Sequence, residues 1–120
     1  MKYMLLIHEA AGTREAFSGE QGAALMAAIE RVMGEVTASG ELIGTGALAD
    51  PVQTRTLRVQ GGVPVTTDGP FAEAKEHLGG YLLLDVESLA RATEIAAAWP
   101  QLESGAIELR PLLGDGGDAR

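Results

Sequence analysis

The sequence predicts an α+β fold in a single domain, and three observations support that prediction. Two segments have the apolar spacing of amphipathic helices, several short segments have the composition of strands, and the two kinds are interleaved. The length of 120 residues is typical of one domain. With 46% hydrophobic and 22% charged residues, the composition is that of a globular protein rather than a disordered chain.

The N-terminal third predicts a strand followed by a long helix. Residues 2–8 form an apolar run that polar residues end, and this length suits a strand. Ser18-Gly19-Glu20-Gln21 has the form of a capping box, and Ser39-Gly40 is a typical helix end. The interpretation is one amphipathic helix over residues 19–38, with an apolar face made of Leu25, Met26, Ile29, Val32, Met33 and Val36.

The middle third predicts further strands and a hairpin. Residues 41–48 form a strand interrupted by glycines, which Asp50-Pro51 ends. Two β-rich segments, 54–59 and 63–67, flank Gly61-Gly62, a dipeptide suited to a tight turn. Residues 81–86 are apolar on both faces, which predicts a central strand covered on both sides.

The C-terminal third predicts a shorter helix and a last strand. Ser88 can cap a helix that Pro100 stops, with Leu89, Ala92, Ala96 and Trp99 on its apolar face. Alternation over residues 107–110 predicts a half-exposed strand. We expect one domain over residues 1–112 and a flexible C-terminal tail over residues 113–120.

This order of elements is the split βαβ arrangement of ferredoxin-like α+β folds with an antiparallel sheet. Two helices cover only one face of such a sheet. Because the strands at 2–8 and 81–86 are apolar on both faces, a monomer would expose a hydrophobic surface. The sequence therefore predicts a homodimer that forms through the other sheet face.

Charge and composition exclude several function classes. Nine basic and seventeen acidic residues give a net charge of −8, which argues against direct binding of nucleic acid. The absence of cysteine excludes disulfides, thiol nucleophiles and zinc sites with cysteine ligands. The apolar N-terminal run is too short for a signal peptide or a membrane span, so we expect a cytoplasmic protein with no membrane partner.

The segment from Asp68 to Glu76 is the most distinctive of the chain. Asp68-Gly69-Pro70 should take the chain out of the sheet, because proline fixes φ and lacks a backbone donor. Beyond it, the acidic and ammonium groups of Glu73, Lys75 and Glu76 lie close to the ring of Phe71. This concentration of charge beside an aromatic ring is a candidate functional site.

The sequence resembles the YCII-related family, and specifically its DGPF subfamily, over about residues 1–112. The resemblance rests on Asp68-Gly69-Pro70-Phe71, on Glu73, Lys75 and Glu76, on Gly79-Gly80-Tyr81, on the first seven residues, and on Ile107 to Pro111. It implies a dimeric ferredoxin-like fold of the α+β barrel type. The wider family has been associated with a His–Asp pair in a cleft, and genes of the subfamily often lie beside sigma-factor genes; the activity of the subfamily is not established.

Five residues are candidates for catalysis: Asp68, Glu73, Lys75, Glu76 and His8. Each has a structural alternative. Asp68 can stabilise its own turn, the Glu-Lys-Glu run can be a solvated surface, and His8 has no partner that the sequence identifies. Pro70 takes the chain off the sheet and leaves this charged segment next to Gly79-Gly80-Tyr81, where glycine permits close approach. This position favours Glu73, Lys75 and Glu76 over His8 and His77, and places residues 68–76 at the border of the functional pocket.

We expect neither a cofactor nor a metal. Residues 44–49 match G-x-G-x-x-A, the dinucleotide fingerprint, but they follow a helix and meet Asp50-Pro51 before another helix can begin. His8 and His77 have no spacing typical of metal ligands. Phe71 is better interpreted as a core or dimer contact than as a ligand platform.

Two functions stay open. The first is the binding of a small organic molecule in a cleft between helix, sheet and residues 68–76, with room for acid–base catalysis that needs no cofactor. The second is a non-enzymatic accessory protein linked to sigma-factor-dependent transcription, which the family association alone suggests. The first function needs a pocket, and the second needs an exposed apolar surface.

Overall fold

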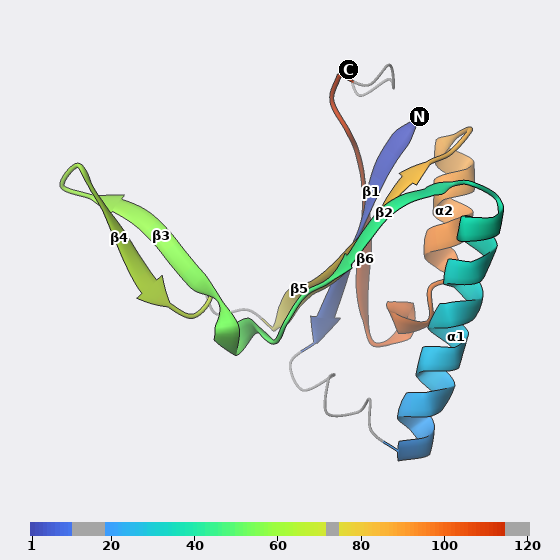
Figure 1. Ribbon diagram of the computed structural model, residues 1–120, viewed down its shortest axis with the longest axis horizontal. Helices are drawn as coiled ribbons and strands as arrows, with labels where there is room; N and C mark the ends of the chain where they lie inside the picture. The colour runs from blue at the N-terminus through green and yellow to red at the C-terminus, as the bar shows by residue number, and fades with distance from the viewer. Residues whose placement is uncertain (11–18, 72–74, 115–120) are drawn as a thin grey trace.

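The chain folds into a four-stranded antiparallel sheet with two helices on one face and a separate two-stranded arm (Figure 1). The computed structural model describes residues 1–10, 19–71 and 75–114. The strand order is β2-β5-β1-β6, and the arm pairs β3 with β4. The elements are β1 (Lys2–Ala10), α1 (Gly19–Ala38), β2 (Leu42–Ala47), β3 (Arg55–Gln60), β4 (Val63–Asp68), β5 (Glu76–Asp85), α2 (Leu89–Ala97) and β6 (Gly105–Pro111).

This order confirms the predicted ferredoxin-like α+β class. The arm is inserted between β2 and β5, which pair directly with each other in the sheet. The two strands predicted to be central, β1 and β5, do occupy the middle of the sheet.

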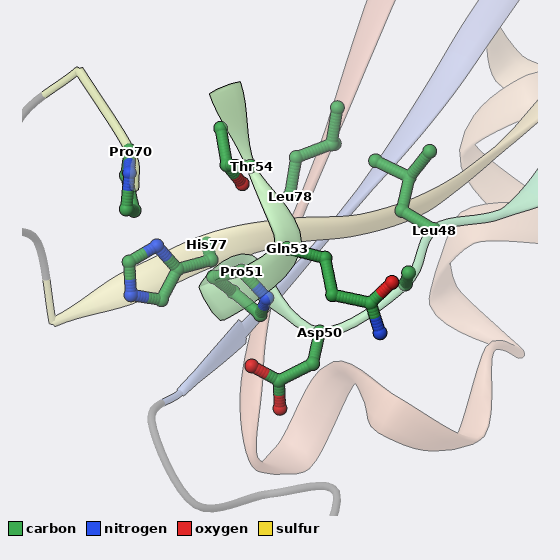
Figure 2. A pocket seen from close by; sticks show the side chains of 9 residues that line it. Leu48, Asp50, Pro51, Gln53, Thr54, Pro70, His77 and Leu78 are labelled. Carbon is green, nitrogen blue, oxygen red and sulfur yellow. The ribbon is translucent and has the colours of Figure 1, made fainter. Parts of the chain in front are cut away.

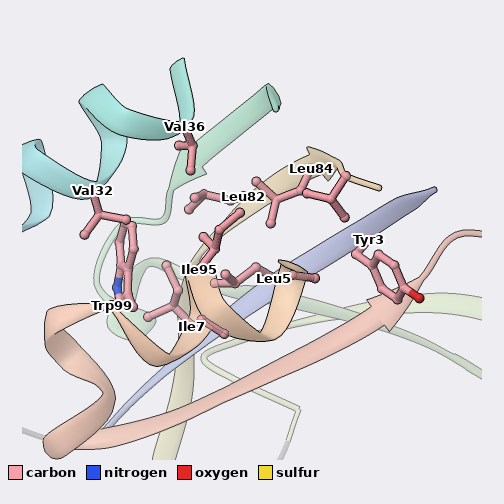
Figure 3. Packing of buried hydrophobic residues seen from close by; sticks show 12 residues of the cluster. Tyr3, Leu5, Ile7, Val32, Val36, Leu82, Leu84, Ile95 and Trp99 are labelled. Atoms are coloured by element: carbon pink, nitrogen blue, oxygen red, sulfur yellow. The ribbon is translucent and has the colours of Figure 1, made fainter. Parts of the chain in front are cut away.

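The helix-facing side of the sheet carries the core. Along β1 every second residue is buried, as the period of a strand requires, and these side chains pack against both helices (Figure 3). Trp99 is also buried there, beyond the end of α2. The largest fully buried side chains are Leu5, Leu82, Leu84 and Val36.

Helix α1 has the bounds that the sequence predicts, and Gly40 follows it at φ 81°. Val32 and Val36 are buried against the sheet, whereas Met26, expected in the core, is 44% exposed. The helix is longer than its support, because its first turns extend past the end of the sheet (Figure 1). The capping residue expected at Ser18 lies outside the described residues.

Helix α2 confirms the predicted cap and corrects the predicted face. The Ser88 hydroxyl accepts a hydrogen bond from the backbone N–H of Arg91 at 3.1 Å. Leu89 is exposed rather than buried, and the face in contact with the sheet consists of Ala92, Ile95 and Ala96. Leu89 is the first residue of the helix and is exposed, so the buried apolar stripe begins one turn later.

The predicted hairpin forms, with Gly61 and Gly62 both at positive φ in the turn. The chain returns from the hairpin at Gly69, whose N–H donates to the Thr54 carbonyl at 2.8 Å. As predicted, β4 ends at Asp68, immediately before Gly69-Pro70. The arm leaves the sheet on the side opposite the helices (Figure 1).

The second sheet face has no helix over it. We call this surface the open face, and its central side chains are half-buried: Met4, Leu6, Tyr81 and Leu83. The expectation that residues 81–86 are covered on both sides is therefore not met within one chain. No helix in the described ranges is long and apolar enough to cross a membrane. Of the predicted tail, residues 115–120 lie outside the described part.

Candidate functional site

One hollow lies between α1 and the helix-facing side of the sheet. It has a volume of about 230 Å³. Its apolar walls come from α1 through Met26, Ile29 and Met33, and from the sheet through Ile7 and Leu82. The exposure of Met26 follows from this hollow, because the side chain faces a cavity and not the packed core.

One wall of this cavity carries a short chain of hydrogen bonds. The indole N–H of Trp99 donates to Oε1 of Gln101 at 3.1 Å, and Nε2 of Gln101 donates to Oε1 of Glu9 at 3.2 Å. Gln101 is 7% exposed, the only polar side chain in the buried set of the described residues. Buried amides need partners, so this chain orients Gln101 and places the Glu9 carboxylate at the cavity wall.

Two glycines of β5 make room for this carboxylate. A register shift in the β1–β5 ladder leaves Gly79 opposite no residue of β1. A Cβ at Gly79 would overlap the side chain of Glu9, and a Cβ at Gly80 would lie 2.9 Å from the Gly46 carbonyl oxygen. The Gly79-Gly80 dipeptide therefore serves close packing, and only glycine leaves the Glu9 carboxylate where it is.

The cavity combines apolar walls with few polar groups. Besides Glu9 and Gln101, β2 contributes Thr45, whose hydroxyl donates to the Tyr81 carbonyl at 3.0 Å. A carboxylate in such a setting accepts hydrogen bonds, and it can also accept or return a proton. The arrangement suits a mainly apolar molecule with one donor group.

The open face brings together three of the five predicted candidates. His8 ends the apolar run of β1, and its Nε2 lies 2.6 Å from Oε1 of Glu108 on β6. Lys75 and Glu76 border the same wide, shallow hollow. The sequence identified no partner for His8 because Glu108 is 100 residues away and reaches it only through the β1–β6 pairing.

The other candidates lie elsewhere. Asp68 sits at the root of the arm, where it pairs with Nε of Arg55 at 3.2 Å and is largely solvated. Glu73 lies outside the described residues. Phe71 is 69% exposed and belongs to no protomer core.

His77 borders a separate hollow of about 380 Å³ where the arm joins the sheet (Figure 2). Leu48 and Leu78 form its apolar part, and Pro51 and Pro70 flank it. These residues come from the two connections that carry the arm. The hollow therefore belongs to the root of the arm.

The dinucleotide-like residues 44–49 extend from β2 into the turn beyond it, and a 3₁₀ turn, Pro51–Gln53, follows. No helix begins there, so the fingerprint lacks the helix N-terminus that binds a pyrophosphate. Within the described ranges, no group of three or more His, Asp or Glu side chains is placed to hold a metal ion.

The model of the YCII-related domain matches residues 1–114. The chain belongs to the YCII-related family. An uncharacterised protein of Rhizobium meliloti (strain 1021) is 32% identical to this YCII-related chain over 114 residues, covering 93% of the chain and 92% of the relative.

A solved structure shares the fold. It is the 5-chloro-2-hydroxyhydroquinone dehydrochlorinase of Burkholderia phenoliruptrix AC1100 in complex with 2,5-dihydroxybenzoquinone. The likeness has a TM-score of 0.50 at 15% identity and covers 98% of the YCII-related chain and all of the neighbour. At this identity the likeness shows the ferredoxin-like fold alone.

Sequence reasoning missed Glu9 and Gln101. Glu9 continues the alternation of Tyr3, Leu5 and Ile7, so the period of two already placed it on the helix-facing side. Gln101 gave no signal, because it lies in a 3₁₀ turn, Pro100–Glu103, whose position depends on the packing of Trp99.

Proposed function

We propose that this YCII-related protein binds a small organic molecule in the cavity between α1 and the sheet, with Glu9 as its polar anchor. The observation that supports this most is the hydrogen-bonded chain from Trp99 through Gln101 to Glu9 along an otherwise apolar wall. Ligand sites are typically apolar pockets with a few oriented polar groups. This assignment replaces residues 68–76 with Glu9 as the centre of the site.

The cavity restricts the ligand to a small molecule with an apolar body. Its volume of about 230 Å³ is below the roughly 300 to 1,000 Å³ of common ligand pockets. A hydroxyl or N–H on the ligand can donate to the Glu9 carboxylate, because the two oxygens of a carboxylate accept several donors. A small phenol, enol or alcohol fits these requirements.

The same contact permits acid–base chemistry without a cofactor. A carboxylate that accepts a hydrogen bond from an acidic O–H or C–H of the ligand can take that proton and return it to another position. Gln101 is fixed by Trp99, so it holds the carboxylate in one orientation during such a transfer. The structural neighbour was solved with a dihydroxylated quinone, and hydroxylated rings of that kind are suitable first probes.

The single tryptophan makes this proposal testable. Trp99 lines the cavity, and its indole N–H gives one resolved NMR signal in ¹⁵N-labelled protein. We expect a panel of small phenols and enols to shift this signal, and Glu9→Gln to weaken binding by at least about tenfold.

Glu108→Gln is the matched control, because it makes the same change on the open face. Affinity should be unchanged in this variant. If Glu108→Gln abolished binding and Glu9→Gln bound normally, the ligand site would be the hollow beside His8 instead.

We also propose that the protein is a homodimer through its open face. Met4 pairs with Leu83 and Leu6 with Tyr81 across β1 and β5, so four apolar side chains form one continuous surface. On β6, Glu108 and Arg110 flank this surface two residues apart, and a two-fold axis between them would pair opposite charges. Light scattering should show a dimer for the wild type and for Leu89→Asp on the outer side of α2, and a folded monomer for Leu6→Asp.

A further inference from the structure

The β3–β4 arm, residues 55–68, has no packing partner of its own in the described chain. Its two strands pair with each other over six residues each, and neither strand joins the main sheet. An isolated two-stranded hairpin is marginally stable in water unless another surface packs against it. A surface on another molecule would stabilise the arm in the extended position that Figure 1 shows.

The arm exposes apolar side chains on both faces. Leu57 is 65% exposed and Val59 is 71% exposed, and the alternation of a strand puts them on one face. Val63, on the other strand, is 59% exposed. A chain that was only a solvated loop would carry polar residues at these positions, so the composition favours a docking element.

The charge of the arm is opposite to that of the rest of the protein. The arm carries two arginines and one aspartate, and the remaining residues carry seven basic and sixteen acidic side chains. Asp68 is paired with Arg55, whereas Arg58 has no ion pair with the described residues and lies 4.8 Å from the centre of the Phe71 ring. A positively charged apolar arm is complementary to the acidic body of a second copy.

We propose that the arm of one protomer docks on the body of a second copy, with Leu57 and Val59 buried and the net positive charge of the arm close to acidic side chains of that copy. The arm leaves the sheet on the side opposite the helices, which is the side of the open face (Figure 1). A copy that covers the open face is therefore adjacent to the arm. This inference rests on the proposed dimer, and it is independent of the ligand cavity.

The roots of the arm allow a clean deletion. The Gly69 N–H donates to the Thr54 carbonyl at 2.8 Å, so the two ends of the arm are adjacent. Replacing residues 55–68 with Gly-Gly should leave the sheet and both helices intact, as circular dichroism can check. In sedimentation equilibrium we expect the dimer dissociation constant to rise by at least about tenfold, equivalent to about 1.4 kcal/mol.

A charge reversal tests the same contact without a deletion. Arg58→Glu should weaken the dimer, and added salt should reduce the difference from the wild type. Arg31→Glu makes the same change on the exposed side of α1 and should leave dimerisation unaltered. Amides of β3 and β4 should exchange with solvent more slowly at concentrations where the dimer forms.

Three results would overturn the inference. The first is a wild-type protein that is monomeric at high micromolar concentration. The second is a dimer dissociation constant of the deletion variant that lies within twofold of the wild-type value. The third is amide exchange in the arm that does not depend on protein concentration. A dimer that Leu6→Asp disrupts and the deletion leaves intact would refute the arm contact alone and keep the open-face dimer. Binding measured through Trp99 is a separate readout, so the ligand proposal stands or fails by itself.

Discussion

Single glycines decide whether the Glu9 carboxylate can reach its position. In Gly79→Ala the new methyl group displaces the Glu9 side chain, which is flexible and can swing away. We expect a loss of about 1 kcal/mol in unfolding free energy, the net value of one hydrogen bond, together with the loss of ligand binding. Urea denaturation and the Trp99 NMR signal measure these two effects separately.

Gly105→Ala is the contrasting variant. Its Cβ would overlap the backbone carbonyl of His8 in the paired strand, and a backbone atom cannot move without breaking the ladder. We expect a loss of at least about 2 kcal/mol, within the range for overpacking. Equal stability of the two alanine variants would contradict this account of the glycines.

Glu41 makes the stability of the fold depend on pH. Nε and Nη2 of Arg91 both donate to its carboxylate at 2.8 Å, and the Ser39 hydroxyl donates at 2.7 Å. These hydrogen bonds, those from Arg91 first, lower the pKa of Glu41 from 4.5 to about 2. Because the folded-state pKa is lowered, this contribution is complete above about pH 4.5 and is lost as the pH falls towards 2.

Glu41→Gln should therefore lower the melting temperature at pH 7 and flatten its fall between about pH 4.5 and pH 2. Glu35→Gln, an equal change on the exposed side of α1, should keep the slope of the wild type. Thermal melts over this pH interval make the comparison, and parallel curves for Glu41→Gln and the wild type would exclude this role for the ion pair.

At the scale of elements, the helices depend on local signals that the sequence displays. Ser88 caps α2 through a hydrogen bond to the Arg91 N–H. Ser88→Ala should cost about 1 kcal/mol of unfolding free energy, and Ser88→Gly only a few tenths, because glycine leaves the cap open to water. Urea titrations of the two variants measure the difference; similar losses would mean that the hydroxyl contributes little.

The pairing of the strands and the position of the arm depend on long-range contacts rather than on local sequence signals. Helix α1 and the Gly61-Gly62 turn could be predicted accurately, since capping, period and positive φ are local properties. The placement of the arm outside the sheet could not, because β2 and β5 pair across an insertion of 28 residues, from Leu48 to Lys75. Strand pairing is a long-range property, and no short sequence pattern states which strands are neighbours.

At the scale of the whole molecule, net charge decides which partners the protein attracts. The net charge of −8 repels the phosphate backbone, and the positive arm is small. We expect no salt-sensitive binding to random duplex DNA at about 10 μM protein and about 150 mM salt, measured by fluorescence anisotropy. Binding that weakens steeply as salt rises would contradict this prediction.

The amino-acid sequence by itself determined the class of fold, the bounds of α1, the hairpin turn and the cap of α2. It also selected His8 as the end of a strand, and Lys75 and Glu76 as part of a charged segment, but only the structure places the three beside one hollow on the open face. These local elements depend on residues that are close together in the sequence, so residue propensity and hydrophobic periodicity are enough to predict them.

The tertiary structure alone decided which side chains work together. His8 meets Glu108, and Glu9 meets Gln101, across separations of 100 and 92 residues. These two adjacent residues of β1 therefore lie on opposite faces of the sheet. His8 lies on the open face, and Glu9 lies on the helix-facing side at the cavity. The physical reason is that a hydrogen bond depends on distances of about 3 Å, and only the strand register and the packing of Trp99 set those distances.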